Sequence, residues 1–194
     1  MDEPRPIPEI GLMIQDGLDS SFEDAFRDAV KISDDRLAVD RYQSGPYAGL
    51  ALYLPTAIMI FIASSYFGGI FKKIGEEHYA ALKEGIVRLW LKARHLKVTA
   101  IGKSAKTADF ERYQLSYSIV AGLSDNIRLK LVLRMDLTEQ ESLDAISEFL
   151  DLVRRIHFDQ LLDAELAILK GIRPIGGTAI VTFDPKSRTI VGTE

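Results

Sequence analysis

The sequence predicts an α+β fold, a single domain in which helices pack on an antiparallel sheet. Three observations lead to this class. Strand-like runs in the C-terminal half are joined by short turns, long amphipathic segments stand apart from them, and no linker divides residues 1–194. A chain of this length can bury one sizeable core. The acidic N-terminal segment, residues 1–46, is expected to belong to the same domain.

Composition narrows the classes of function. Of the 194 residues, 47% are hydrophobic and 27% are charged, which is typical of a globular protein. Cysteine is absent, so disulfides and thiolate sites are excluded and a reducing, cytoplasmic location is expected. The acidic, proline-rich start MDEPRPIPEI lacks the early apolar run of a secretory signal. A net charge of −4 does not favour a nucleic-acid partner.

The N-terminal part alternates strand and helix signals. GLMIQD, residues 11–16, has the character of a short strand, and RLAVDRYQ, residues 36–43, is a second candidate. Between them, residues 20–31 carry one apolar stripe at helical spacing. Ser20 followed by Glu23 has the spacing of a capping box, so we expect the helix to begin there.

Residues 47–71 contain no charged side chain. Pro55 divides this run, because proline lacks an amide hydrogen and disfavours helical angles in the residue before it. Before the proline, GLALYL (residues 49–54) is expected to form a buried strand. After it, residues 56–68 are expected to form one fully apolar central helix. At about 1.5 Å per residue that helix rises roughly 20 Å, which is short of the roughly 30 Å hydrocarbon core of a bilayer.

Membrane insertion is the alternative interpretation of the same run. Proline is tolerated in lipid-spanning helices, and lysines follow from Lys72 onward. In this alternative the apolar segment 47–71 enters the bilayer and the basic segment 72–106 lies at anionic lipid on the cytoplasmic side. In the soluble interpretation, Ile60 and Phe61 both belong to the core.

The remaining helices and strands follow from periodicity. Residues 76–96 are amphipathic at helical spacing, and Gly85 in their middle indicates close packing against a neighbour. KVTAIG, residues 97–102, has the pattern of a strand. QLSYSIVAG and IRLKLVLR, residues 114–122 and 127–134, are expected to pair antiparallel across a short turn.

The last third begins with the clearest helix signal. Thr138 and Glu141 have the spacing of a capping box ahead of an apolar stripe that runs to residue 158, and helical character continues to Gly171. TAIVTF and RTIVG then flank the turn DPKS, which predicts a terminal hairpin.

Catalytic motifs are missing from the chain. GKS at residues 102–104 lacks the earlier glycine of a phosphate-binding loop, and no serine lies in a GxSxG elbow. His78, His95 and His157 do not have metal-ligand spacing. The missing motifs favour a non-enzymatic role, and no cofactor or metal is assigned. An enzyme whose site is assembled from scattered residues is a second alternative.

Basic side chains form the one constellation that points to a ligand. One group closes the helix 76–96, and a second alternates with apolar residues along the strand 127–134, which predicts a basic solvent face there. If these surfaces adjoin, phosphate or an anionic headgroup is the expected ligand. The anion-binding candidates are Arg88, Lys92, Arg94, Lys97, Arg128, Lys130 and Arg134.

Taken together, these features predict a non-enzymatic, soluble interaction or regulatory module. Its expected partner is another protein or a second copy of the chain. Base-stacking aromatic residues interleaved with the basic ones are few, so a nucleic-acid partner is not expected.

Overall fold

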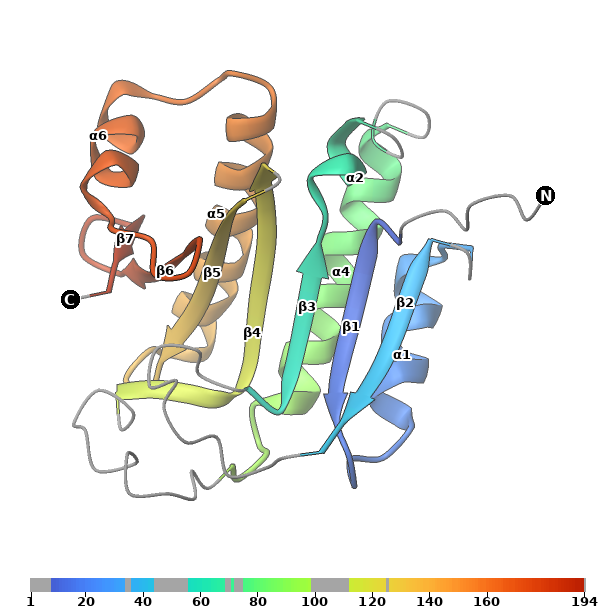
Figure 1. The fold of residues 1–194 in the computed structure, drawn as a ribbon. Helices are drawn as coiled ribbons and strands as arrows, with labels where there is room; N and C mark the ends of the chain where they lie inside the picture. The colour runs from blue at the N-terminus through green and yellow to red at the C-terminus, as the bar shows by residue number, and fades with distance from the viewer. Residues whose placement is uncertain are drawn as a thin grey trace.

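The described residues form one seven-stranded mixed sheet with helices layered on one face (Figure 1). The structure is a computed structural model that describes residues 8–33, 36–43, 56–68, 71, 75–98, 112–124 and 126–193. The strands are β1 (Ile10–Gln15), β2 (Leu37–Tyr42), β3 (Ile58–Ile62), β4 (Tyr113–Ser124), β5 (Ile127–Arg134), β6 (Thr178–Asp184) and β7 (Thr189–Gly192). The helices are α1 (Ser21–Val30), α2 (Ser64–Gly68), α4 (Glu76–Ala93), α5 (Glu139–His157) and α6 (Asp163–Gly171).

The sheet is mixed, so the antiparallel sheet expected from the sequence is wrong, although the α+β class holds. The strand order is β2-β1-β3-β4-β5-β6-β7. The pairs β1–β2, β3–β4 and β5–β6 are parallel, while β1–β3, β4–β5 and β6–β7 are antiparallel. A helix lies between the two strands of each parallel pair, and such a crossover is the connection that parallel neighbours require. The antiparallel pair expected over residues 114–134 and the expected terminal hairpin are both present.

The expected apolar helix over residues 56–68 is also wrong. Ile58–Ile62 is a strand, β3, in the middle of the sheet, and the helix α2 covers only Ser64–Gly68. A run that is apolar on every side fits a buried strand as well as a buried helix. In IMIFI, the β-branched isoleucines alternate with unbranched residues, and β-branched residues pack well in a pleated sheet.

Several expectations fall on parts of the chain that the structure does not describe. The strand expected at residues 49–54 and the GKS tripeptide lie outside the described residues. Of the strand expected at residues 97–102, only Lys97 and Val98 are described, and they do not form one. Among the helices of the described ranges, none is long and apolar enough to cross a membrane.

The helix termini show which capping signals were correct. Thr138 caps α5: its Oγ1 accepts from the Glu141 amide, and the Glu141 carboxylate accepts from the Thr138 amide, as a capping box requires. Ser20 makes no side-chain cap for α1. There the Asp19 carboxylate accepts from the Ser21 amide at 2.8 Å instead. Asp19 is a better acceptor at this position because an anion is favoured at a helix N-terminus.

One apolar core lies between the sheet and the layer of α1, α4 and α5 (Figure 1). The helix-facing positions of β1 and β3 are isoleucines and a leucine with no exposed surface. Gly85 of α4 faces α1, and a Cβ built on it would lie 2.6 Å from Cγ2 of Val30. The close approach predicted from Gly85 is therefore confirmed, because only a residue without a side chain fits there.

Candidate functional site

Two of the predicted anion-binding residues on α4 already have partners, one within the helix itself and one on α1. Arg88 pairs with Glu84 one turn earlier. Lys92 bonds to the Ser21 hydroxyl, and its Nζ lies 4.9 Å from the centre of the Phe22 ring. The Lys92 contacts join α4 to the first turn of α1 and account for this lysine structurally.

Arg94 and Arg134 each pair with a carboxylate near the start of α5. Arg94 pairs with Glu139 and lies 5.6 Å from the Trp90 ring centre. Arg134 holds Asp136, with 2.8 Å between Nε and Oδ1. The hydrogen bond from Arg134 lowers the pKa of the Asp136 carboxyl below its ordinary value. Both guanidinium groups thus already face an acid, which weakens their attraction for a further anion.

The three other candidates differ in exposure. Lys97 and Arg128 are exposed, and no ion pair to either is formed within the described ranges. Lys130 is only 5% exposed, so the basic solvent face expected for residues 127–134 is wrong at its centre. Burial lowers the pKa of the Lys130 amine to about 8. The neighbouring Val132 on the same face is fully buried as well, which shows that both faces of β5 are covered there.

The strand candidate Lys130 and the helix candidates Arg88 and Lys92 do not share a surface. Lys130 lies opposite Val120 of β4 in register, on the face of the sheet away from the helices. Arg88 and Lys92 are on α4, in the helical layer behind the sheet (Figure 1). Arg134 is the last residue of β5 and pairs with Asp136 just beyond the strand. A ligand would therefore meet Lys130 apart from Arg88 and Lys92.

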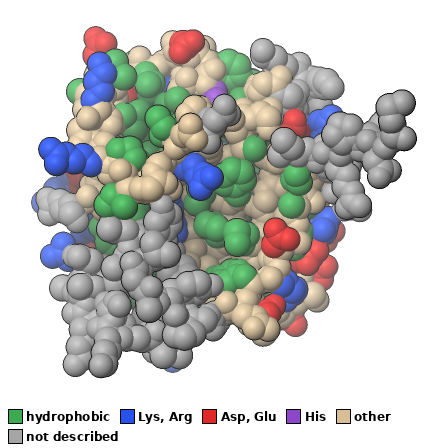
Figure 2. Space-filling view, viewed as in Figure 1, with side chains coloured by type: hydrophobic (Ala, Val, Ile, Leu, Met, Phe, Trp, Pro, Cys, Tyr) green, Lys and Arg blue, Asp and Glu red, His purple; other side chains and the backbone are tan. Residues whose placement is uncertain are grey.

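A different feature stands out on the second face of the sheet. Over β1 and β3, this face carries Met13, Met59 and Phe61, each partly exposed, while the alternate positions are fully buried against the helices. Figure 2 shows hydrophobic side chains gathered there, in the same view as Figure 1. The register places Met13 beside Met59 and Gly11 beside Phe61. We call Gly11, Met13, Met59 and Phe61 the open strip.

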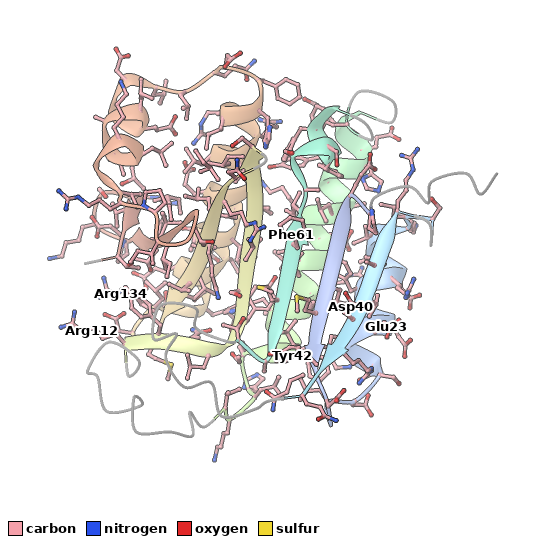
Figure 3. All side chains as sticks on the ribbon, viewed as in Figure 1. Glu23, Asp40, Tyr42, Phe61, Arg112 and Arg134 are labelled. Carbon is pink, nitrogen blue, oxygen red and sulfur yellow. The ribbon has the colours of Figure 1, made fainter. Side chains whose placement is uncertain are left out.

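The open strip has defined borders. Toward the sheet edge, Asp40 of β2 lies beside Met13 in register and is exposed (Figure 3). Toward the sheet centre, Ser118 and Val120 of β4 lie beside Met59 and Phe61 and are buried. Gly11 adds no bulk, and a Cβ on it would lie 3.4 Å from the Cβ of Phe61. Phe61 therefore rests across the backbone of β1.

Sequence reasoning missed this strip because every residue of β3 is apolar. The run was expected to belong to a helix over residues 56–68 that is buried on every side, so no exposed face was anticipated. The signal that could have found it is the alternation within IMIFI, where β-branched isoleucines mark one face and methionine and phenylalanine mark the other. Methionine is common at adaptable binding surfaces because its side chain is flexible and polarizable.

A second group of polar and aromatic side chains surrounds α2. The Tyr66 hydroxyl lies 3.0 Å from Nδ1 of His78. Nearby, the Arg36 guanidinium lies 3.6 Å from the Glu9 carboxylate. Nε2 of His78 and Oε2 of Glu9 are buried without a hydrogen-bond partner. Burial raises the pKa of the Tyr66 hydroxyl and, reinforced by Arg36, lowers the pKa of the His78 imidazole.

Neither group of side chains has the geometry of a known catalytic centre. Within the part of the chain that the structure describes, no three His, Asp or Glu side chains are placed to hold a metal ion. Tyr66 and His78 form a polar pair, and no serine or cysteine nucleophile accompanies them among the contacts of that cluster. Comparison with known proteins adds no assignment: no family model, no curated protein and no solved structure matches this chain.

Proposed function

We propose that this chain is a protein-interaction module that binds an amphipathic helix of a partner protein on the open strip. One observation supports the proposal. A sheet that is layered by helices on one face presents partly exposed Met13, Met59 and Phe61 on the other. Apolar side chains gathered on one open face can receive an apolar partner surface, and an amphipathic helix laid on an apolar surface is a recurring recognition mode.

The dimensions of the strip suit a single helix. Adjacent strands are about 4.8 Å apart, so the strip on β1 and β3, taken with its border strand β2, spans roughly 10 Å between the outer strands. A helix with its side chains is about 10–12 Å wide. The five residues of β3 extend about 17 Å at roughly 3.3 Å each, which matches about three helical turns.

The same dimensions argue against a second copy as the occupant. A stable interface buries about 800 Å² on each partner. Even with its β2 border the strip measures about 10 by 17 Å, a footprint of only roughly 170 Å², so two strips stacked face to face would bury too little area. A short segment with a transient, weak association fits this surface better.

The strip also predicts the sequence pattern of its partner. Apolar side chains at helical positions i, i+3 or i+4, and i+7 would lie on Met13, Met59 and Phe61. Because Asp40 is exposed at the β2 border, a lysine or arginine on that flank of the helix would gain from its charge. The unbranched methionines can adjust to helices of different sequence, which suits a module with several partners.

A peptide titration tests the proposal. The ligand is a fluorescently labelled synthetic helix of about 14 residues, with leucines on one face and lysines along one flank. A scrambled peptide of the same composition is the control. We expect the amphipathic peptide alone to bind the full chain, and Phe61→Ser to weaken binding about tenfold or more, equivalent to about 1.4 kcal/mol. Ile127→Ser, at an exposed isoleucine outside the strip, should leave binding unchanged.

Three results would count against the proposal. These are equal binding of the scrambled peptide, equal binding by Phe61→Ser, or a chain that dimerises in sedimentation and dissociates on Phe61→Ser. The last result would make a second copy the occupant. The membrane-inserting and enzymatic alternatives stay predictions, because none of the contacts above favours them specifically.

A further inference from the structure

The short helix α2 is held between two histidines that come from different helices. On one side, the Tyr66 hydroxyl meets Nδ1 of His78, in the first turn of α4. On the other side, the Phe67 ring stacks on His157, the last residue of α5, with ring centres 4.4 Å apart and planes 16° apart. The helix has only five residues, so side-chain contacts must hold it in place.

The surroundings of His78 do not suit a charged imidazole. His78 is 7% exposed, and its Nε2 has no hydrogen-bond partner. In the charged form both ring nitrogens carry hydrogens, so Nε2–H would be a buried donor without an acceptor. From other elements, the charge of Arg36 acts on the ring and repels an imidazolium, and Arg36 is itself paired with Glu9. On α4 itself, Glu76 and Glu77 are exposed.

His157 is also in a site that favours the neutral ring. The elements packed against it present the Phe67 ring from α2 and the Gly122 carbonyl from β4, which lies 3.0 Å from Nε2. Within the described ranges no carboxylate pairs with His157. The neighbouring arginines of α5 are occupied, Arg154 with Glu76 and Arg155 with Glu148 and Glu165.

We propose that α2 is a pH-sensitive latch, which protonation of His78 and His157 releases from α4 and α5. Burial lowers the pKa of both histidines below the ordinary value, and at His157 the bond to Gly122 opposes this only in part. The released state therefore binds protons more readily than the docked state. Docking is fully stable above about pH 6.5, the pKa of an unperturbed histidine, and weakens as the pH falls below it.

Release of α2 would also affect the open strip, because α2 directly follows β3 in the chain. Only Ala63 separates the end of β3 from the start of α2, and β3 carries Met59 and Phe61. Loosening α2 would thus free the end of the strand that forms the strip. The latch itself rests on the histidine contacts alone and stands whether or not the strip binds a helix.

Because the chain has no cysteine, a single nitroxide label can report on the latch. We place it at Ser65→Cys on the exposed side of α2, and at Ala167→Cys on the exposed side of α6 as a control. Lowering the pH from about 7.5 to about 5 should raise the mobile fraction of the Ser65 spectrum about threefold or more, with a midpoint below about 6.5. The Ala167 spectrum and the far-UV circular dichroism should not change.

Histidine variants decide whether the two rings cause the change. His78→Asn keeps an acceptor near Nδ1 and His157→Phe keeps a ring on Phe67, and neither new side chain titrates. The double variant should remove the transition at Ser65, while His95→Asn, at an exposed histidine, should preserve it. If the double variant does not fold, the histidine resonances of the unmodified chain must titrate with the same midpoint as the label. A Ser65 spectrum that is constant with pH, a transition that survives in the double variant, or resonances that titrate elsewhere would each overturn the proposal.

Discussion

Strands β3 and β5 differ in side-chain polarity, and their exposure is the reverse of what that polarity suggests. IMIFI of β3 is wholly apolar, yet Met59 and Phe61 are partly exposed. IRLKLVLR of β5 alternates apolar and basic residues, yet Leu129 through Leu133 are all buried, Lys130 included. The polarity of a strand therefore does not report how many of its faces are covered.

The difference follows from what lies on the second face of each strand. On the helix side both strands contribute to one core. On the other side β3 borders the open strip, whereas the centre of β5 is covered. A lysine can tolerate such cover because its long aliphatic stem packs like an apolar side chain, although burial makes the charge of its amine costly. The following substitutions test this contrast, beginning with the largest expected effect.

Aspartate substitutions at Ile60 and Phe61 compare the burial of the two faces of β3. Ile60 has no exposed surface, so Ile60→Asp should cost several kcal/mol and unfold most of the population. Phe61 is on the open strip, so Phe61→Asp should cost only about 1–2 kcal/mol. Urea denaturation followed by circular dichroism measures both. Equal losses would show that the strip is part of the core.

Alanine at Val132 and Met59 compares the same face on the two strands. Val132 is fully buried on β5, so Val132→Ala should cost about 2–3 kcal/mol through lost burial and a residual cavity. Met59→Ala removes a larger side chain from a partly exposed position and should cost about 1 kcal/mol. Thermal melts of the two variants give the order. A larger loss of stability for Met59→Ala than for Val132→Ala would mean that residues around Val132 repack to fill the cavity, or that the open strip is occupied.

Lys130→Met tests the buried amine of β5 through the pH dependence of stability. The folded-state pKa is about 8 and the unfolded value is about 10.4, so the unfolded chain binds more protons between these values. Stability should therefore rise by up to about 2 kcal/mol from pH 7.5 to 9.5 in the parent chain. The variant should lose this rise.

Urea midpoints at the two pH values measure that difference. The range stops below pH 10 because burial raises the pKa of Tyr66, Tyr79 and Tyr117. Above that point, ionisation of tyrosines in the unfolded chain opposes the lysine effect. An unchanged slope in Lys130→Met would show that the amine is not the group responsible.

The smallest effect is expected at Arg128, two residues before Lys130 on the same face. Arg128 is exposed, and no ion pair to it is formed within the described part of the chain. Arg128→Ala should therefore change stability by less than about 0.5 kcal/mol. Isothermal titration with inorganic phosphate then asks whether Arg128 belongs to the anion site that the sequence predicted. A loss of stability above 1 kcal/mol would place this residue in the packed structure.

Local sequence signals predicted several elements correctly. The helix α5 and its Thr138 cap, the long helix α4 and both hairpins follow from short-range patterns that the structure confirms. Gly85 predicted a close contact, but only the fold shows that α1 supplies it. The cap of α1 was assigned to Ser20, because Asp19 lies one residue outside the expected motif.

The candidate sites were much less accessible to sequence reasoning. The predicted cations are distant in sequence, and whether they meet depends on the sheet order, which the wrong antiparallel assignment did not provide. The contacts of α2 join residues 66, 67, 78 and 157, and no local pattern links such positions. The open strip depends on what covers each face of β3, and side-chain polarity does not record this.

By itself the sequence determined where most helices and strands form, because periodicity, capping and turn residues act over a few neighbouring positions. The tertiary structure decided which strands are parallel, that Ile58–Ile62 extends as a strand, that Lys130 is buried and that Phe61 is not. These outcomes depend on which surfaces meet across the sheet, and burial is a property of that assembly.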